Sequence, residues 1–254
     1  VFDSNYPAKQ EIVENWETDD EYWKISKEQL HLNIPDQIKQ KSYITFKREI
    51  TDYSVYNSEI IDAISADVML AFDVTTTGKN GGISILLEED EKTYEVFIRS
   101  RGGKEESHLR ISDSIVDSNS DAFINPQETS RIEFSTADNE IIVKLNDSVI
   151  FSHTYDTDLS SLEGYTKFSS LKLGGINTDA IFKNITISRD VFYTESGKWG
   201  TFNPVEIGEK QYFFLGDNSR NSNDSRYWKF VPESSMVGRS FMVFWPLRTI
   251  KIIR

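Results

Sequence analysis

The stretch "EIIVKLNDSVIFSHTY" (Glu140–Tyr155) decides the fold class of this chain. It consists of two runs in which apolar and polar residues alternate, separated by Asn146 and Asp147. Alternation with a period of two is typical of half-buried β-strands, and a turn-forming pair between two such runs favours a tight hairpin. The stretch therefore predicts two antiparallel strands joined by a two-residue turn.

The same alternation recurs upstream, in "YEVFIR" (Tyr94–Arg99), in Ala66–Val74 and in Ile83–Leu87. Clusters of Gly, Ser, Asn and Asp separate these runs and are typical of turns. Many short strands with frequent turns predict an all-β sandwich or jelly roll. We expect Trp16 and Trp23 to belong to its core.

The composition limits which kinds of chemical site this chain can contain. The 254 residues are enough to bury a substantial core, and the absence of cysteine excludes disulfides and thiolate sites. The histidines (His31, His108 and His153) show no metal-ligand spacing, so we expect strand or surface histidines, no metal and no cofactor.

Charge differs between the two parts of the chain. Residues 1–189 carry a net charge of −15 and residues 190–254 a net charge of +2, within a total of −13. This shift indicates two units with different surfaces. The acidic surface of the larger part argues against a nucleic-acid partner.

Both ends of the long acidic part carry further patterns. It opens with "NWETDDEYWKISKEQLHLNI" (Asn15–Ile34) and closes with "LKLGGINTDAIFKNITISRD" (Leu171–Asp190). This start and finish resembles a concanavalin-like, laminin-G-type jelly-roll sandwich. Members of that superfamily often bind glycans, so the resemblance leaves a glycan or protein ligand of the sandwich open.

The C-terminal part contains a polar loop between two apolar segments. "QYFFL" (Gln211–Leu215) predicts a buried strand, "GDNSRNSNDSR" (Gly216–Arg226) a loop, and "MVGRSFMVFWP" (Met236–Pro246) a returning strand. Asn, Asp and Ser side chains stabilise turns by bonding to nearby backbone groups. From composition alone, an ordinary hairpin loop explains the segment.

The order of residues in this loop resembles the last sequence box of type I signal peptidases, peptidase family S26. The family pattern is Gly-Asp-Asn-x-x-x-Ser-x-Asp-Ser-Arg. It is matched without a gap by Gly216, Asp217, Asn218, Ser222, Asp224, Ser225 and Arg226. "YWKFVP" and the closing "VGRSFMVFWP" also follow the family, with Lys229 at a usual glycine and Ser240 at a usual alanine.

The resemblance implies a serine peptidase with a lysine general base, whose pKa must be depressed by burial. It assigns Ser222 the role of orienting that lysine and Asp224 and Arg226 that of a bracing ion pair. Gly216, Asp217, Asn218 and Ser225 would shape the loop. The family's nucleophile box, Ser-Met-x-Pro-Thr, and its lysine box are not present, and Ser235 lacks the following x-Pro. We therefore expect the chain to be inactive by itself.

The resemblance also implies an organisation. Residues 1–12 would be a linker from an upstream catalytic part, residues 13–190 the inserted sandwich, and residues 191–254 part of the peptidase β core. This organisation resembles that of planctomycete-type signal peptidases, which carry such an insertion between the lysine box and the last box. The chain itself would be a soluble fragment.

The parent protein would be anchored in the bacterial cell membrane by an upstream segment and would cleave preprotein signal peptides on the extracytoplasmic side. Two alternatives remain. One is a non-catalytic glycan- or protein-binding sandwich, and the other is an inactive scaffold derived from the peptidase.

Overall fold

The computed structural model describes residues 2–3, 15–47, 51–52, 63–64, 68–77, 80–89, 92–137, 139–155, 168–190, 197–200, 203–216, 222–239, 242–243 and 251–252. The chain divides into two compact units, Val1–Val191 and Phe192–Arg254. We call them the sandwich unit and the C-terminal unit. No helix among the described residues is long and apolar enough to cross a membrane.

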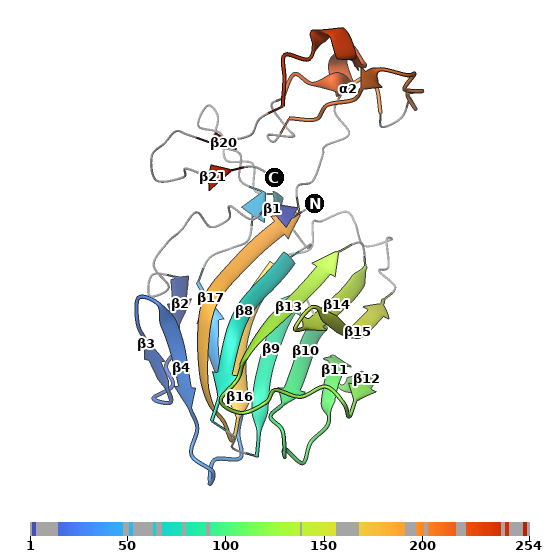
Figure 1. The fold of residues 1–254 in the computed structure, drawn as a ribbon. Coiled ribbons are helices and arrows are strands. Elements are labelled where there is room, and N and C mark those ends of the chain that lie inside the picture. The colour runs from blue at the N-terminus through green and yellow to red at the C-terminus, as the bar shows by residue number, and fades with distance from the viewer. Residues whose placement is uncertain are drawn as a thin grey trace. The chain divides into compact units, whose positions relative to one another are not determined.

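The sandwich unit is built from two large antiparallel sheets (Figure 1). The larger has eight strands in the order β15-β14-β13-β8-β17-β4-β3, with β1 pairing to β17. Its strands are β1 (Phe2–Asp3), β3 (Trp23–Ile25), β4 (Gln29–Asn33), β8 (Val68–Thr76), β13 (Thr129–Ala137), β14 (Glu140–Leu145), β15 (Ser148–Thr154) and β17 (Asp179–Asp190).

The second sheet has seven strands in the order β12-β11-β10-β9-β16-β5-β2. Its strands are β2 (Trp16–Glu17), β5 (Ser42–Phe46), β9 (Gly82–Glu89), β10 (Lys92–Arg99), β11 (Ser107–Ile111), β12 (Ser114–Asn119) and β16 (Phe168–Ile176). A short separate ladder joins β6 (Thr51–Asp52) to β7 (Ala63–Ile64). The all-β sandwich prediction is confirmed.

Several pairs of consecutive strands change from one sheet to the other, and two of these pairs join the middle of the sandwich unit to its end. Strands β8 and β9 follow one another but lie in opposite sheets, as do β16 and β17. Strand β17 pairs with β8 in one sheet, and β16 pairs with β9 in the other. The last two long strands thus close both sheets against strands from the middle of the chain.

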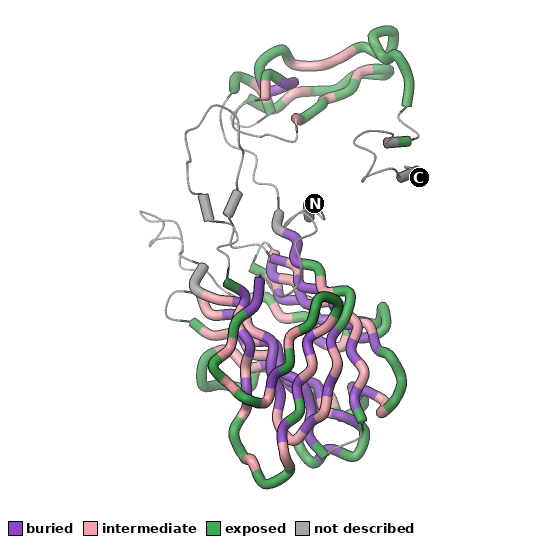
Figure 2. Tube along the Cα trace, turned by 90° about the vertical axis from the view of Figure 1, so that its left-hand side faces the viewer, coloured by how far each residue is buried: buried purple, intermediate pink, exposed green. Residues whose placement is uncertain are grey.

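The core lies between the sheets, because each strand turns every second side chain inward. Along β13 the residues alternate between buried and intermediate from Ser130 to Ala137, and Figure 2 shows this alternation on many strands. Trp16 and Trp23 are both buried, as predicted. The Phe182 ring lies 5.7 Å from the Trp23 ring and 5.5 Å from the Phe72 ring, which forms an aromatic cluster in the core.

The hairpin at Asn146 and Asp147 is present as predicted. The two residues have φ values of 48° and 66°. Positive φ at both central residues is the type I′ turn, whose twist matches that of the flanking strands. The Asn146 side chain accepts from the Arg131 N–H at 2.8 Å, which ties the turn to the neighbouring strand β13.

The N-terminal pairing of the sandwich unit involves residues that the sequence assigns to a linker. Phe2 pairs with Asp190 and Asp3 with Arg189, so β1 lies beside the end of β17 (Figure 1). The first described residues and the last residues of β17 are therefore neighbours in space.

The C-terminal unit contains short elements. They are the strands β18 (Gln211–Tyr212), β19 (Val231–Pro232), β20 (Met242–Val243) and β21 (Lys251–Ile252), the helical turn α2 (Ser225–Trp228) and a 3-10 turn (Glu233–Ser235). Strand β18 pairs with β19, and β20 with β21. The prediction of a buried strand over Gln211–Leu215 is wrong, because the strand ends at Tyr212 and Phe214 and Leu215 are exposed.

Candidate functional site

The polar loop of the C-terminal unit is organised around the Asp224 carboxylate. One oxygen, Oδ1, accepts from the backbone N–H of Arg226 at 3.1 Å and from its Nε at 2.9 Å. The other, Oδ2, accepts from Arg226 Nη2 at 2.8 Å and from the Gly216 N–H at 3.0 Å. Asp224 therefore caps α2, holds the Arg226 guanidinium with two bonds, and fixes the start of the loop.

Both residues of this ion pair are buried. Asp224 is 5% and Arg226 2% exposed. Burial by itself would raise the pKa of Asp224, but the hydrogen bonds from the Arg226 side chain and from the N–H groups of Gly216 and Arg226 outweigh it, so the pKa lies below its usual value. The carboxylate is charged at neutral pH and is fully used in holding the loop.

Ser225 and Phe214 join the two sides of the loop. The Phe214 N–H donates to Ser225 Oγ at 2.9 Å, and the Ser225 N–H donates to the Phe214 carbonyl at 3.0 Å. Among the described residues of this unit, only Asp224, Ser225 and Arg226 are buried, and Figure 2 shows this short buried segment amid exposed chain. The centre of the unit, as described, is polar.

Ser222 lies against Gly216 in a contact that only glycine allows. A Cβ on residue 216 would lie 2.0 Å from Ser222 Oγ, which is far inside van der Waals contact. Ser222 is partly exposed and its hydroxyl has no hydrogen-bond partner among the described residues. Gly216, Ser222, Asp224, Ser225 and Arg226 are thus brought together, whereas Asp217 and Asn218 lie outside the described residues.

A second segment contacts this loop and was missed by sequence reasoning. The Arg226 carbonyl accepts from the N–H groups of Lys198 at 2.7 Å and Trp199 at 2.9 Å. These bonds tie residues 198–199 to the end of the polar loop. They use backbone groups that every residue except proline carries, so no sequence signal marks them.

Lys229 occupies a strained backbone position directly after α2. Its φ is 84° and its ψ is −81°, a backbone conformation that residues other than glycine rarely adopt. Its N–H still donates to the Ser225 carbonyl at 2.8 Å, and its Nζ lies 4.8 Å from the centre of the Trp199 ring. This is the position at which the family pattern has glycine, so the departure noted in the sequence coincides with backbone strain.

We expect Lys229→Gly to leave the C-terminal unit about 1 kcal/mol more stable than Lys229→Ala does. Both variants lose the contact with Trp199, and they differ in the backbone strain that remains. Amide hydrogen exchange at Trp199 and Ser225 measures the difference. An alanine variant as stable as the glycine variant would contradict the strain.

The apolar side chains of this unit lie largely on its surface. The exposed ones include Tyr212, Phe214, Leu215, Tyr227, Trp228 and Val237. Ser235 is also exposed, in the 3-10 turn.

Comparison with known proteins identifies the segment that carries the loop. Residues 170–245 match the family described as "Signal peptidase, peptidase S26". The match begins within β16 and includes the polar loop. It covers less than a third of the chain.

Curated relatives give the same description. A probable signal peptidase I-2 of Synechocystis is 44% identical over 52 residues, which are 20% of this chain and 24% of that protein. A signal peptidase I of Buchnera aphidicola is 34% identical over 110 residues, 41% of this chain and 33% of that protein. The chain thus spans a third or less of the length of these relatives.

Solved structures are similar to about two thirds of the chain at low sequence identity. A carbohydrate-binding module from Bacillus subtilis is 13% identical with a TM-score of 0.48, covering 68% of this chain and 94% of that one. A galectin-like protein of unknown function from Bacillus subtilis is 12% identical with a TM-score of 0.48, covering 70% and 90%. The two-sheet architecture itself is defined by the strand pairing described above.

The three histidines of the chain lie on strands of the sandwich unit. His31 is on β4, His108 on β11 and His153 on β15. Within the described part of the chain, no group of three or more His, Asp or Glu side chains could hold a metal ion. His31 Nε2 lies 2.7 Å from Asp179 Oδ1 on the neighbouring strand β17, a cross-strand contact.

Proposed function

We propose that the C-terminal unit supplies the last part of the active site of a membrane-anchored type I signal peptidase. The observation that supports this most directly is the ordered box from Gly216 to Arg226, folded around the buried Asp224–Arg226 pair. In this proposal the peptidase cleaves signal peptides from preproteins on the extracytoplasmic side of a bacterial membrane. The nucleophilic serine and the lysine base lie outside the 254 residues.

Each residue of the loop has a role in the proposal. Ser222, which is partly exposed, orients the amine of the lysine base. Asp224 and Arg226 act as positioning residues, because their side chains are buried and bonded to each other. Gly216 admits the close approach of Ser222, and Ser225 joins the loop to Phe214. Asp217 and Asn218 are proposed to shape the same loop.

The organisation of the chain forms part of the proposal. Residues 1–12 lead from an upstream catalytic part, residues 13–190 form a laminin-G-like insertion of the planctomycete type, and residues 191–254 return to the catalytic β core. The exposed apolar side chains Phe214, Leu215 and Trp228 support this, because they leave the unit with surface to bury against further chain.

The proposal is tested in the intact parent protein with Ser222→Ala. A misoriented base should lower kcat for cleavage of a preprotein by about 100-fold or more, and Ser222→Thr should restore part of the loss. Ser235→Ala is the matched control, since Ser235 is exposed and outside the loop, and it should leave turnover unchanged. A pH–rate profile that shifts in Ser222→Ala separates orientation of the base from a merely structural role.

Asp224→Asn provides a second check on the loop. It keeps the shape of the side chain and removes the charge that pairs with Arg226, so cleavage should also fall. Unchanged turnover in both Ser222→Ala and Asp224→Asn would remove the assigned roles.

A further inference from the structure

Two arginines of the sandwich unit share one aromatic ring. The guanidinium carbon of Arg99 lies 5.6 Å from the centre of the Phe123 ring, and that of Arg101 lies 5.2 Å from it. Arg99 is the last residue of β10, Arg101 lies in the loop between β10 and β11, and Phe123 lies in the loop between β12 and β13. We call these three residues the arginine patch. The proposed peptidase function gives this patch no role.

Neither arginine of the patch pairs with a carboxylate within the described part of the chain. Two other arginines of the same unit do so, because Arg110 Nε lies 3.9 Å from Glu95 Oε2 and Arg131 Nη1 lies 3.2 Å from Asp73 Oδ1. Carboxylates are abundant on this unit, since residues 1–189 carry a net charge of −15. The positive charge of the patch is therefore not neutralised by the carboxylates described around it.

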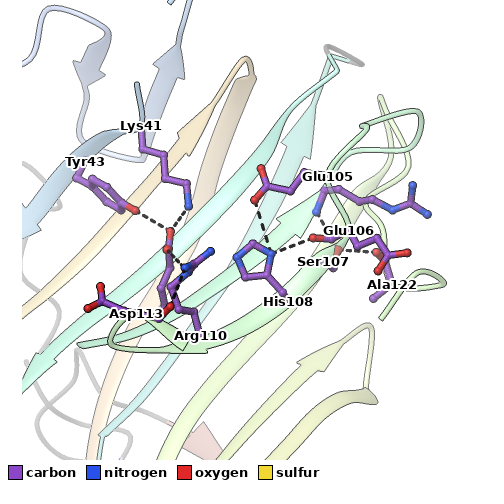
Figure 3. A network of polar contacts seen from close by, with 11 residues as sticks. Lys41, Tyr43, Glu105, Glu106, Ser107, His108, Arg110, Asp113 and Ala122 are labelled. Atoms are coloured by element: carbon purple, nitrogen blue, oxygen red, sulfur yellow. Dashed lines mark hydrogen bonds and ion pairs between the residues drawn. The ribbon is translucent and has the colours of Figure 1, made fainter. Parts of the chain in front are cut away.

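Hydrogen bonds between the two loops hold the aromatic ring in place. The Ile124 N–H donates to the Arg99 carbonyl at 2.9 Å, and the Arg101 N–H donates to the Ile124 carbonyl at 2.9 Å. The Ser107 hydroxyl donates to the Ala122 carbonyl at 2.7 Å, a bond that Figure 3 shows at the start of β11. The ring's two neighbours in the sequence, Ala122 and Ile124, are both buried. These contacts fix the backbone on both sides of the ring, so the patch is formed before a partner binds.

The two guanidinium groups differ in how many of their N–H groups are already used. Arg99 donates from Nη1 to the Gly103 carbonyl at 3.2 Å and from Nη2 to the Ser120 carbonyl. Arg101 is exposed and donates from Nη1 to Asn125 Oδ1 at 3.3 Å. A guanidinium carries several further N–H donors, so Arg101 keeps Nε and Nη2 for a ligand. We therefore expect Arg101 to contact a ligand directly, and Arg99 to hold the two loops together and add its charge.

The phenylalanine ring supports this arrangement. A guanidinium near the face of an aromatic ring is attracted by the charge distribution of the ring. In that position the N–H groups along its edge stay free to bind a carboxylate through two parallel bonds. Phe123 is itself partly exposed, so it adds apolar surface next to the charged groups. The patch thus combines two cations with an apolar contact.

The patch lies at the end of the sandwich unit opposite to the pairing of β1 with β17. The Gln127 N–H, in the same loop as the ring, donates to the Thr76 carbonyl at 2.7 Å, and Thr76 pairs with Ala180 at the start of β17. Strand β1 pairs with Arg189 and Asp190 at the other end of the same strand (Figure 1). Strand β17 has 12 residues, and at about 3.3 Å per residue its ends are about 30–40 Å apart. A partner at the patch is therefore far from the points where the chain enters and leaves the sandwich.

The charge of the surrounding unit limits which anions suit the patch. The net charge of −15 on residues 1–189 repels extended polyanions such as nucleic acids and anionic membrane surfaces. The same two loops also contain Glu105, Glu106, Asp121 and Glu128, which add negative charge locally. A short segment with few charges meets less of this repulsion. The apolar ring also favours carboxylates that neighbour an apolar side chain over a bare inorganic anion.

We propose that the arginine patch binds a short acidic segment of a partner protein. One carboxylate of that segment pairs with Arg101, a second lies in the positive field of Arg99 and Arg101, and an adjacent apolar side chain packs against Phe123. Ion pairs at exposed arginines are weak, so a dissociation constant of about 1 mM is expected for an isolated short peptide. This binding role does not depend on the peptidase activity proposed above.

The test is an NMR titration of the full 254-residue chain with the peptide acetyl-Glu-Leu-Glu-amide. The controls are acetyl-Gln-Leu-Gln-amide, which has the same shape without the charges, and inorganic phosphate. We expect a saturable shift with the glutamate peptide, at the amides of Gly102, Ala122 and Ile124 and at Arg101 Nε. Salt at about 1 M, which screens charges beyond about 3 Å, should remove most of the binding.

Three variants locate the binding site. Arg101→Gln should weaken binding about tenfold, because it removes the direct ion pair but keeps an exposed polar side chain. Phe123→Leu should weaken binding about threefold, since it keeps an apolar side chain but removes the ring that orients both guanidinium groups. Arg131→Gln is the matched control, because it removes the same charge from the same unit outside the patch, and it should change affinity by less than about twofold.

Several outcomes would overturn the proposal. They are no saturable shift with the glutamate peptide, equally tight binding of the glutamine peptide, binding of phosphate as tight as that of the glutamate peptide, and an equal loss of affinity in Arg101→Gln and Arg131→Gln. None of these outcomes bears on the peptidase assay of Ser222, so the two proposals can fail separately.

Discussion

Replacing Arg226 by methionine is expected to lower the free energy of unfolding of the C-terminal unit by about 3–5 kcal/mol. Methionine fills much of the space of the arginine stem but leaves the Asp224 carboxylate buried without its guanidinium partner. The carboxylate must then either keep an uncompensated charge or take up a proton. Because the buried residues described in this unit are Asp224, Ser225 and Arg226, little else there offsets the loss.

Amide hydrogen exchange measures this effect in each unit separately. Protection at Phe214, Gly216 and Trp199, whose N–H groups bond to the loop, should fall by about 100-fold or more in Arg226→Met. Protection in the sandwich, at Phe134 for example, should not change. Arg239→Met is the control, because Arg239 is exposed in the same unit and its loss should change stability by less than about 0.5 kcal/mol. Equal protection in Arg226→Met and Arg239→Met would contradict the assigned importance of the pair.

The same ion pair sets the direction of the acid response. The pKa of Asp224 is lower in the folded unit than in the unfolded chain. Its stabilisation is therefore fully present above the unfolded pKa of about 3.9, and it is lost as the pH falls through the lower folded value. The double variant Asp224→Asn/Arg226→Met should recover part of the stability lost in Arg226→Met and should lack this acid dependence.

Phe182→Ala is expected to lower the melting temperature of the sandwich unit by about 6–20 °C. Phe182 is completely buried between the sheets and packs against Trp23 and Phe72. Removing its ring costs about 3–5 kcal/mol, because both apolar burial and the contacts around the resulting cavity are lost. Near-ultraviolet circular dichroism during heating follows the loss of aromatic packing.

Val149→Ala is the control for the core variant. Val149 lies on β15 of the same sheet but is 56% exposed, so its truncation should change the melting temperature by no more than about 2 °C. A Phe182→Ala variant that melts within about 2 °C of the unaltered chain would show that the aromatic cluster does not support the fold.

Local sequence patterns predicted the features that depend on local rules. The hairpin at Asn146 and Asp147 follows from a turn pair that tolerates positive φ and from alternation on both sides. The burial of Trp16 and Trp23 follows from large apolar side chains in strands with a period of two. In the C-terminal unit, the order of residues from Gly216 to Arg226 pointed to five described residues that the fold brings together.

The missed features depend on contacts between distant segments. The run Gln211–Leu215 is apolar enough for a buried strand, but β18 ends after two residues because Phe214 bonds to Ser225 instead of to a neighbouring strand. The cluster of Lys41, Tyr43 and Glu95 joins β5 and the residue before it to β10, although Glu95 is 54 and 52 positions from Lys41 and Tyr43 in the sequence. Alternation marks each of these side chains as outward-facing but does not say which of them share a face.

The pairing of Asp3 with Arg189 has a consequence for any chain that contains this sandwich. Paired Cα atoms on antiparallel strands are about 5 Å apart, so residues 4–188 begin and end at nearly the same point. When this segment is inserted into a loop of a surrounding protein, the two ends of that loop need to be no further apart than in a tight turn. The folding of the sandwich offsets the entropy that is lost when its own two ends are brought together. The segment between Asp3 and Arg189 can therefore be lengthened, shortened or exchanged without moving the two points at which the surrounding chain enters and leaves it.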